Sequence, residues 1–297
     1  KWLCISGAGI KCMGKFAEVL KKSGSGTKAS PRPDPPKEQS RKVESSEEIE
    51  RLRLNTSSPE PKGPPTPEPI TDDMDERLKA FLEPSSMAAE CFKLLRAKIL
   101  TRNAASRPRS IMITSPQPVD GKTTVATNLA INIAQGINEH VLLVDCDLRR
   151  PYVDKLMGIH AEHGLSDYLK EGGSVAPYLL KTSIDKLQLL PSGRPPANPS
   201  ELLASEKMER LVMELKTRYE DRYVIYDATP AQFAAETTSL SSVIDAVLLV
   251  VRAGQTTQMI ISEALENIDR EKILGIVFNA SEQPSHDYRM YYRYYHK

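Results

Sequence analysis

The chain has 297 residues, and its 40 basic and 39 acidic residues give a formal net charge of +1. This balance excludes binding to DNA or to an acidic membrane through overall charge alone. Ten of the 22 prolines lie between Pro31 and Pro69, so we expect a single folded domain of about 200 residues behind a polar, Pro-rich stretch.

The cysteines and the hydropathy narrow the class of protein further. The four cysteines show no CxxC spacing, and two of them fall in apolar helix or strand patterns, where a thiol is a small hydrophobic group. No 18 uncharged apolar residues run together, and the first residues lack a convincing signal-peptide core. We therefore expect a soluble chain in a reducing cytoplasm, with Met13 as a candidate start.

The N-terminal quarter is predicted to be a short helical segment, residues 1–22, followed by a flexible linker, residues 23–83. The linker contains PRPDPP and PEPKGPPTPEP, which favour extended, polyproline-like conformations. Such a segment acts as a spacer, and the alternative is a ligand for proline-reading domains.

The folded part, residues 84–283, is predicted to begin near Pro84 with a helix that Ser85 or Ser86 caps and that runs to Thr101. Short apolar strands then alternate with helices. Strands are expected at 110–114, 141–145, 187–190, 223–227, 246–251 and 273–279, and helices at 123–136, 199–219 and 257–269.

This alternation indicates an α/β fold, a doubly wound and mostly parallel sheet covered on both faces. Ligands of such sheets bind outside the carboxyl ends of the strands. The residues that follow 110–114, 141–145 and 223–227 are therefore expected to converge.

The loop after the first strand, SPQPVDGKTT, leads directly into a helix. Backbone N–H groups at such a helix start cradle phosphate, Lys122 adds a positive charge, and the Thr123 hydroxyl can hold Mg²⁺. The standard GxxxxGK[ST] pattern requires Gly at 116, where this chain has Pro, so the loop is a deviant Walker A motif, with a structural turn as the alternative. The expected nucleotide-binding residues here are Asp120, Gly121, Lys122, Thr123 and Thr124.

Acidic residues follow the other two strands. Asp145 and Asp147 lie two residues apart where a strand gives way to a loop, and Asp227 ends the strand YVIYD. Carboxylates beside a nucleotide suit metal coordination and proton acceptance from an attacking hydroxyl. Any one of these aspartates alone would be interpreted as a turn residue at a strand end or as a partner in a surface ion pair. Three strand ends of one sheet that carry such residues favour a functional site instead.

The three motifs together resemble the bacterial tyrosine kinases, P-loop NTPase-like cytoplasmic autokinases of capsule and exopolysaccharide biosynthesis. The resemblance spans about residues 85–297 and includes GLSDYL, LLPSGRPPANPSELLAS and ILGIVFN. The acidic motif DCDLRRP is its most specific part, because it distinguishes these kinases from the related partition and septum-site ATPases.

The resemblance implies ATP as the phosphate donor and Mg²⁺ as the cofactor. It implies that Lys122 is the phosphate-binding lysine and that Thr123 is the metal-binding hydroxyl. Asp145 resembles the metal-linked aspartate and candidate base, Asp147 the second acidic residue, and Asp227 the Walker B aspartate that also binds the metal.

One further position matches the family, and two depart from it. Asn279, after the last strand, resembles the asparagine that reads adenine. Val119 stands where the family usually has Gly, and residues 228–230 read Ala-Thr-Pro where the family usually reads Thr-Pro-Pro. Neither departure removes a group that the chemistry needs.

A helix motif implies oligomers. Glu90, Lys93 and Arg96 fall on the family's ExxRxxR motif, which builds rings, with Lys in place of the first Arg. Lys does not make the bidentate contact of Arg, which weakens the expectation of a stable ring.

The C-terminal tail, residues 284–297, contains five of the chain's 11 tyrosines, an unusual composition for a terminus. In the bacterial tyrosine kinases such clusters are the autophosphorylation region. The expected acceptors are Tyr288, Tyr291, Tyr292, Tyr294 and Tyr295.

Charge suggests how the tail works. Arg289, Arg293 and Lys297 against Asp287 give it about +2, so we expect it to be drawn in trans to a neighbour's acidic site. Each phosphate adds about −1.5 to −2, which would reverse the sign and expel the tail. The alternative is a tail that packs on its own domain or stacks on RNA.

Partners follow from the resemblance: a second copy of the chain in a homo-oligomer such as a ring, a membrane-bound activator related to chain-length-determinant proteins, and a tyrosine phosphatase. The sequence has no transmembrane segment, so the activator is expected to be a separate protein that recruits the cytoplasmic kinase to the inner face of the plasma membrane. No nucleic acid partner is expected.

Two other functions compete with the kinase. A partition or positioning ATPase, a nucleotide-switched binding module, would share the sheet and the loop. The DLRRP motif, the tyrosine tail and the lack of a second lysine early in the loop favour a kinase. A non-catalytic interaction protein is the third reading, although every charged group named above is present.

Overall fold

The computed structural model describes residues 74–78, 82–101, 107–217, 222–232 and 234–281, which all belong to one compact unit. The expected N-terminal helical segment, nearly all of the linker, and the tyrosine tail lie outside these residues. Within the described part, no helix is both long enough and apolar enough to cross a bilayer.

The described chain folds around a seven-stranded sheet with the order β3-β4-β2-β5-β1-β6-β7. Every neighbouring pair is parallel except β3 and β4, so the predicted α/β fold with a mostly parallel sheet is confirmed. The strands are β1 (Ser110–Thr114), β2 (His140–Asp145), β3 (Leu180–Lys181), β4 (Leu187–Leu190), β5 (Arg222–Asp227), β6 (Ala246–Arg252) and β7 (Ile273–Asn279).

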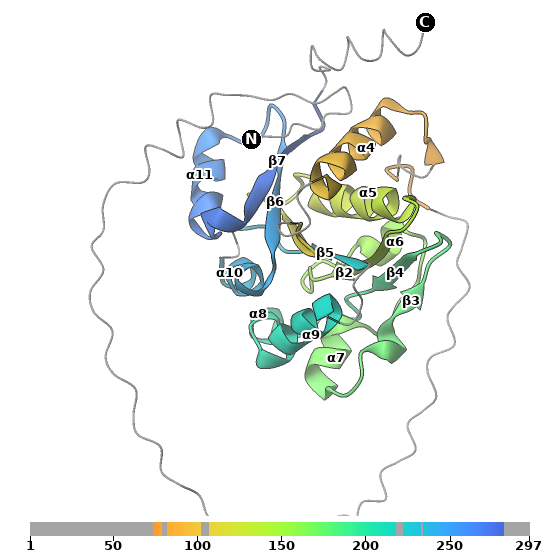
Figure 1. Cartoon of the computed structure of the whole chain (residues 1–297). Helices are drawn as coiled ribbons and strands as arrows, with labels where there is room; N and C mark the ends of the chain where they lie inside the picture. The colour runs from red at the N-terminus through yellow and green to blue at the C-terminus, as the bar shows by residue number, and fades with distance from the viewer. Residues whose placement is uncertain (1–73, 79–81, 102–106, 218–221, 233, 282–297) are drawn as a thin grey trace, which may run out of the picture. The chain divides into compact units, whose positions relative to one another are not determined.

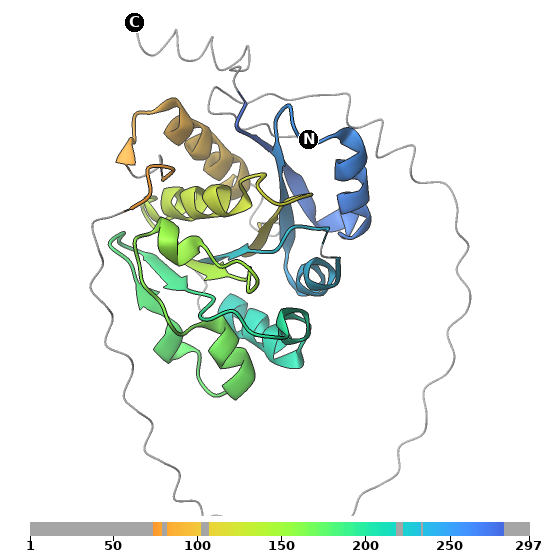
Figure 2. The same cartoon turned by 180° about the vertical axis from the view of Figure 1, so that it is seen from behind.

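Helices cover both faces of this sheet (Figures 1 and 2). On one face α5 packs on the strands and α4 packs on α5, while α9 and α10 contact the other face. The helices are α4 (Met87–Leu100), α5 (Lys122–Ala134), α6 (Val153–Leu156), α7 (Leu165–Glu171), α8 (Pro199–Leu203), α9 (Glu206–Thr217), α10 (Ala234–Val243) and α11 (Gln258–Glu266), with 3₁₀ turns η2 (Ala176–Tyr178) and η3 (Arg270–Lys272).

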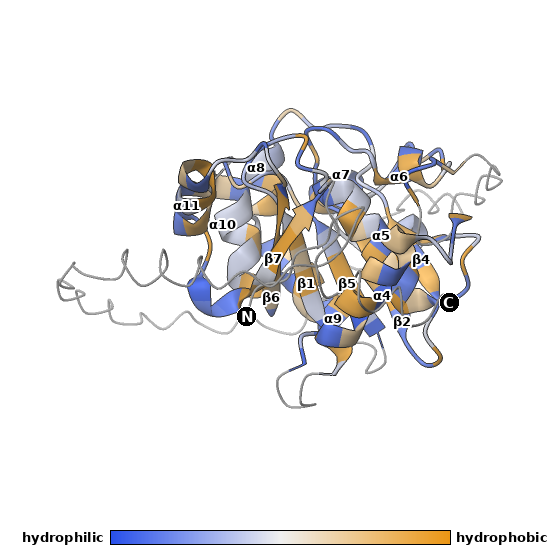
Figure 3. Cartoon of the chain, turned by 90° about the horizontal axis from the view of Figure 1, so that it is seen from above, coloured by the Kyte–Doolittle hydropathy of each residue, from blue (hydrophilic) through white to orange (hydrophobic). Residues whose placement is uncertain are grey.

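Hydropathy explains this layering. The central strands β1, β2 and β5 are buried over nearly their whole length, and Figure 3 shows apolar strands between the helices. Helix α5 is buried nearly all round because it lies between the sheet and α4. At the start of α4 the Ser86 hydroxyl accepts the N–H of Ala89 at 3.1 Å, which confirms the predicted cap.

Several details differ from the sequence analysis. The helical region expected at 199–219 is two helices, α8 and α9, separated at Ala204 and Ser205. The helices α6, α7 and α10 and the short strand β3 were not predicted. The packed part also begins before Pro84: the Leu78 side chain is fully buried in the core, and Asp75 N–H donates to the Leu156 carbonyl at 3.0 Å.

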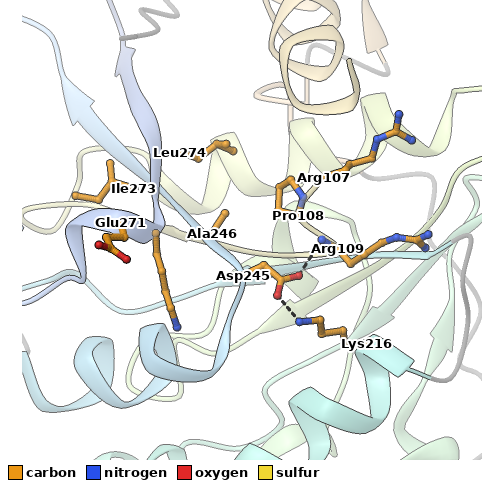
Figure 4. A pocket seen from close by; sticks show the side chains of 10 residues that line it. Arg107, Pro108, Arg109, Lys216, Asp245, Ala246, Glu271, Ile273 and Leu274 are labelled. Atoms are coloured by element: carbon orange, nitrogen blue, oxygen red, sulfur yellow. Dashed lines mark hydrogen bonds and ion pairs between the residues drawn. The ribbon is translucent and has the colours of Figure 1, made fainter. Parts of the chain in front are cut away.

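At the amino ends of the strands lies a cavity of about 430 Å³ (Figure 4). Asp245 accepts the backbone N–H groups of Arg109 (3.0 Å) and Ser110 (3.1 Å) there and forms an ion pair with Lys216. Asp245 thereby joins the start of β1 to the end of α9, so this cavity is part of the scaffold.

Candidate active site

The carboxyl ends of β1, β2 and β5 meet at a cleft of about 900 Å³ at the other edge of the sheet. Asp145 and Asp227 are register partners on β2 and β5, and Lys122 follows the loop after β1. Lys122 Nζ lies 2.8 Å from Asp147 Oδ2 and 3.6 Å from Asp227 Oδ1. The predicted convergence of the three strand ends is therefore confirmed.

The loop before α5 is held by side chains from β6, β7 and the segment after β6. Asn279 Nδ2 donates to the Asp120 carbonyl at 2.9 Å, and the Asp120 carboxylate accepts the Thr256 hydroxyl at 2.7 Å. Gly121 has φ +93°, and a Cβ there would lie 2.0 Å from Asn279 Nδ2. Glycine is therefore needed at 121, both for its backbone angle and for this close contact. Asp120 and Asn279 hold the loop, and Thr124 lies beside them in the cleft.

Val119 is strained in this loop. Its φ is +69°, and its side chain is 79% exposed, so no packing compensates for the unfavourable backbone. A β-branched residue at positive φ is a rare outlier that costs about 1–3 kcal/mol. The departure from Gly that the sequence showed at 119 thus has an energetic cost.

Replacing Val119 by Gly should stabilise the nucleotide-free protein by about 0.5–2 kcal/mol, because the relief of strain exceeds the entropy cost of a glycine. Thermal denaturation measures this gain. Val119→Ala is the matched control and should gain less, since alanine is not β-branched but still disfavours this φ. A lower melting temperature for Val119→Gly would contradict the assigned strain.

Lys122 is the positive centre of the site. Its side chain is 11% exposed, and its Nζ also donates to the Thr123 hydroxyl at 3.0 Å. Burial alone would lower the pKa of Lys122, but the carboxylates of Asp227, Asp147 and Asp145 outweigh it and raise the pKa above its usual value. The lysine is therefore charged at neutral pH and available to an anionic ligand.

Asp227 is fully buried, and neither of its carboxylate oxygens has a hydrogen-bond partner. Burial raises its pKa to about 6, although Lys122 opposes the shift. No cluster of three or more His, Cys, Asp or Glu suited to a metal exists among the described residues. Mg²⁺ does not need one, because it keeps several waters and binds one or two carboxylates beside substrate phosphates. Asp227, whose oxygens accept no hydrogen bond and whose ion-pair partner is Lys122, and the Thr123 hydroxyl fit such an ion.

The two carboxylates of the DCD motif have different surroundings. Asp145 accepts three backbone N–H groups, from Asp147, Tyr152 and Val153, at 3.0–3.2 Å. Burial and the nearby Asp227 raise the pKa of Asp145 well above its usual value. Asp147 instead lines the cleft beside Lys122. Asp145 therefore fixes the shape of the loop, and Asp147 is the carboxylate that a ligand in the cleft meets.

The rim of the cleft carries several basic residues, and this bears on the expectation that an acidic site attracts the basic tail. Besides Lys122 it is lined by Arg77, Arg149, Arg150 and Arg252, with Asp147 as its acidic member. Arg77 is paired with Asp75 and Arg149 with Glu236, so the rim is less positive than its arginines alone suggest, and a bound nucleotide would strengthen the attraction for a tail of about +2.

These arginines were not predicted as site residues. Arg149 and Arg150 belong to the motif DCDLRRP, and the sequence analysis considered only surface ion pairs for that motif. Arg252 ends β6, so the strand-end rule that found the aspartates would also have found it. Arg77 belongs to a segment assigned to the linker and had no local signal.

The predicted oligomer residues lie on α4, where they contact other residues of the same chain. Lys93 pairs with Glu90 and donates to the Pro84 carbonyl at 3.1 Å, while Arg96 donates to the Asn132 carbonyl at 2.9 Å. The predicted acceptor tyrosines lie outside the described residues.

Comparison with known proteins shows which proteins this chain is similar to. A family model described as an AAA domain matches residues 109–273. The tyrosine-protein kinase YwqD of Bacillus subtilis (strain 168) is 33% identical over 221 residues, which cover 74% of this chain and 92% of YwqD. The tyrosine-protein kinase wzc of Salmonella typhimurium is 30% identical over 217 residues, which cover 72% of this chain and 30% of that relative.

A solved structure of a tyrosine kinase domain is also similar to this chain. The kinase domain of the Escherichia coli tyrosine kinase ETK superposes with a TM-score of 0.64 at 29% identity, covering 70% of this chain and 82% of that domain.

Proposed function

Because the chain belongs to the family of bacterial tyrosine-protein kinases, we propose that it transfers the γ-phosphate of ATP to tyrosines, including those of its own C-terminal tail. The observation that carries this proposal is the convergence of Lys122 with Asp147 and Asp227 at one cleft. The competing reading, a partition-type ATPase, shares this fold, but the relatives at 30–33% identity are named as tyrosine kinases.

Different residues bind the different parts of ATP. The N–H groups of the loop and of the start of α5 receive the phosphates, and Lys122 supplies a charge toward the transferred group. Asn279, which borders the loop on the β7 side, contacts the adenine. Thr123, Asp145 and Asp227 would hold Mg²⁺, and the ion would neutralise phosphate charge.

In the transfer, the tyrosyl oxygen forms a bond to the γ-phosphorus while the bond from that phosphorus to the bridging oxygen of ADP breaks. The hydroxyl proton passes to the acidic pair, in which Asp147 faces the cleft and Asp145 has the raised proton affinity. A nearby base is useful because the ordinary pKa of tyrosine, near 10, keeps it protonated at neutral pH.

The tail of a second copy presents the acceptor in trans, and the acceptors are Tyr288, Tyr291, Tyr292, Tyr294 and Tyr295. Since basic residues line the empty cleft, bound ATP lowers the positive charge there before the basic tail docks. Glu90, Lys93 and Arg96 contribute to the contact between copies. A membrane-bound activator and a tyrosine phosphatase complete a cycle that controls capsule or exopolysaccharide polymerisation and export at the plasma membrane.

Incubation with ATP and Mg²⁺, followed by mass mapping of phosphotyrosine, tests the acceptor assignment. Replacing all five tail tyrosines by Phe should remove at least about nine-tenths of the phosphate that the chain incorporates, because each acceptor hydroxyl is lost while the ring is kept. Tyr178→Phe, a partly exposed tyrosine far along the chain from the tail, is the control and should change nothing. Unchanged phosphorylation of the five-Phe chain would refute the acceptors.

A further inference from the structure

A second charged cluster connects the loop after β2 to helices α8 and α10. Glu236, in the first turn of α10, is 1% exposed, and its Oε1 accepts hydrogen bonds from Arg149 Nε and from the Ser200 hydroxyl, both at 2.8 Å. Arg149 Nη2 also donates to Ser200 Oγ at 3.1 Å. The other carboxylate oxygen, Oε2, has no hydrogen-bond partner.

A buried carboxylate is costly unless it is paired, so this cluster needs an explanation beyond stability. Helix α8, which carries Ser200, packs against α10, and the side chains from both helices hold one arginine. The Nε–Nη2 edge of the Arg149 guanidinium is fixed in this way, yet its side chain is still 43% exposed and lines the nucleotide cleft. The cluster therefore presents an arginine of fixed orientation to the cleft.

The sheet order shows which side of the cleft this arginine occupies. Asn279 ends β7 on one side of the loop after β1, whereas Arg149 follows β2 on the other side, beyond β5. In phosphoryl transfer the attacking and leaving oxygens are roughly in line. If the nucleotide base lies toward β7, the acceptor enters from the side of β2.

We propose that Arg149 is the residue that receives the acceptor tyrosine, and that Glu236 and Ser200 are positioning residues that fix its guanidinium. This inference rests on the proposed kinase function and adds the acceptor subsite to it. A guanidinium over a tyrosine ring is attractive, and a planar group held along its Nε–Nη2 edge orients the ring as well as binding it. The hydroxyl of that ring then faces Asp147, which belongs to the same loop.

The test uses the full chain and a peptide with the sequence of residues 284–297. Arg149→Met, Glu236→Gln and Ser200→Ala should each lower kcat/KM for the peptide, by about tenfold for the first two. The dissociation constant for ADP should stay within about twofold, because the nucleotide uses other groups. Glu206→Gln, which breaks an exposed ion pair with Arg210 on α9, is the matched control.

A double-mutant cycle separates positioning from mere structure. Glu236→Gln should add nothing in the Arg149→Met background if it acts through that arginine, and Glu236→Asp should restore part of the activity. Additive losses, an equal loss of ADP affinity, or full activity of Arg149→Met would overturn the inference. Because Arg149 is partly exposed, its variant tests the inference even if Glu236→Gln does not fold.

Failure of the proposed function gives a different result. A wild-type chain that phosphorylates no tyrosine would contradict the proposed kinase activity. The acceptor subsite is tested separately, by measuring peptide binding in the presence of a non-hydrolysable ATP analogue. Weaker peptide binding by Arg149→Met supports the subsite, and unchanged binding refutes it.

Discussion

Replacing Lys122 by Met should reduce tyrosine phosphorylation by about a hundred- to a thousandfold, the range observed when one preorganised charge-stabilising group is removed from an active site. Lys122 forms ion pairs with both Asp147 and Asp227, and it is charged at neutral pH. No other lysine lies in the cleft, among the residues that line it, to replace this charge. The measurement is incorporation of phosphate into the tail peptide at saturating ATP and Mg²⁺.

The same substitution also affects folding, which the experiment must separate from catalysis. Removing the cation leaves buried carboxylates unpaired, at a cost of about 3–5 kcal/mol at neutral pH. Lys122→Arg keeps the charge and most of the stability, yet should also be inactive because its larger planar group does not replace a point charge on the phosphates. Lys98→Met, at an exposed position of α4, is the control for loss of a lysine. An active Lys122→Arg or Lys122→Met chain would exclude the proposed role.

The position of the site could be predicted because it follows from a rule of sheet geometry. Parallel strands point the same way, so Lys122, Asp145 and Asp227, each placed at or after a strand end, had to meet at one edge. The continuous apolar runs of β1, β2 and β5 were enough to identify those ends. The helix α10 was not predictable in the same way, because its sequence AAETTSLSSV has no marked apolar face and becomes helical through packing on α8 and α9.

What the sequence did not reveal depends on hydrogen bonds between distant residues. The separate surroundings of Asp145 and Asp147 arise from the path of the loop up to Val153, which no spacing rule predicts. Arg77 reaches the cleft from a segment that packs on α5 and α6 through Asn128 and Leu156, some 50 to 80 positions away along the chain. The contribution of Arg77 to the basic rim was therefore visible only in three dimensions.

Asp227→Asn should also abolish transfer, by about a hundredfold or more, because the buried carboxylate is the group best suited to Mg²⁺. Its effect on stability should have the opposite sign to that of Lys122→Met. Burial raises the pKa of Asp227 to about 6, whereas the ordinary value is 3.8. Between these pH values the folded state binds the proton more tightly than the unfolded state, so Asp227 makes the free energy of unfolding fall as pH rises from about 4 to 6.

The asparagine variant lacks this titration, so in the absence of nucleotide and Mg²⁺ it should be more stable than the wild type by about 1–3 kcal/mol at pH 7.5. The difference should shrink toward zero near pH 4, where Asp227 is protonated. Thermal denaturation at pH 4, 6 and 7.5 measures it, with Asp185→Asn, an exposed aspartate, as the control. Mg²⁺ with ADP should stabilise the wild type more than the variant, because only the wild type has the carboxylate that the ion neutralises. A variant that is less stable at pH 7.5 without ligands would mean that Asp227 serves the fold, and the metal assignment would lose its main support.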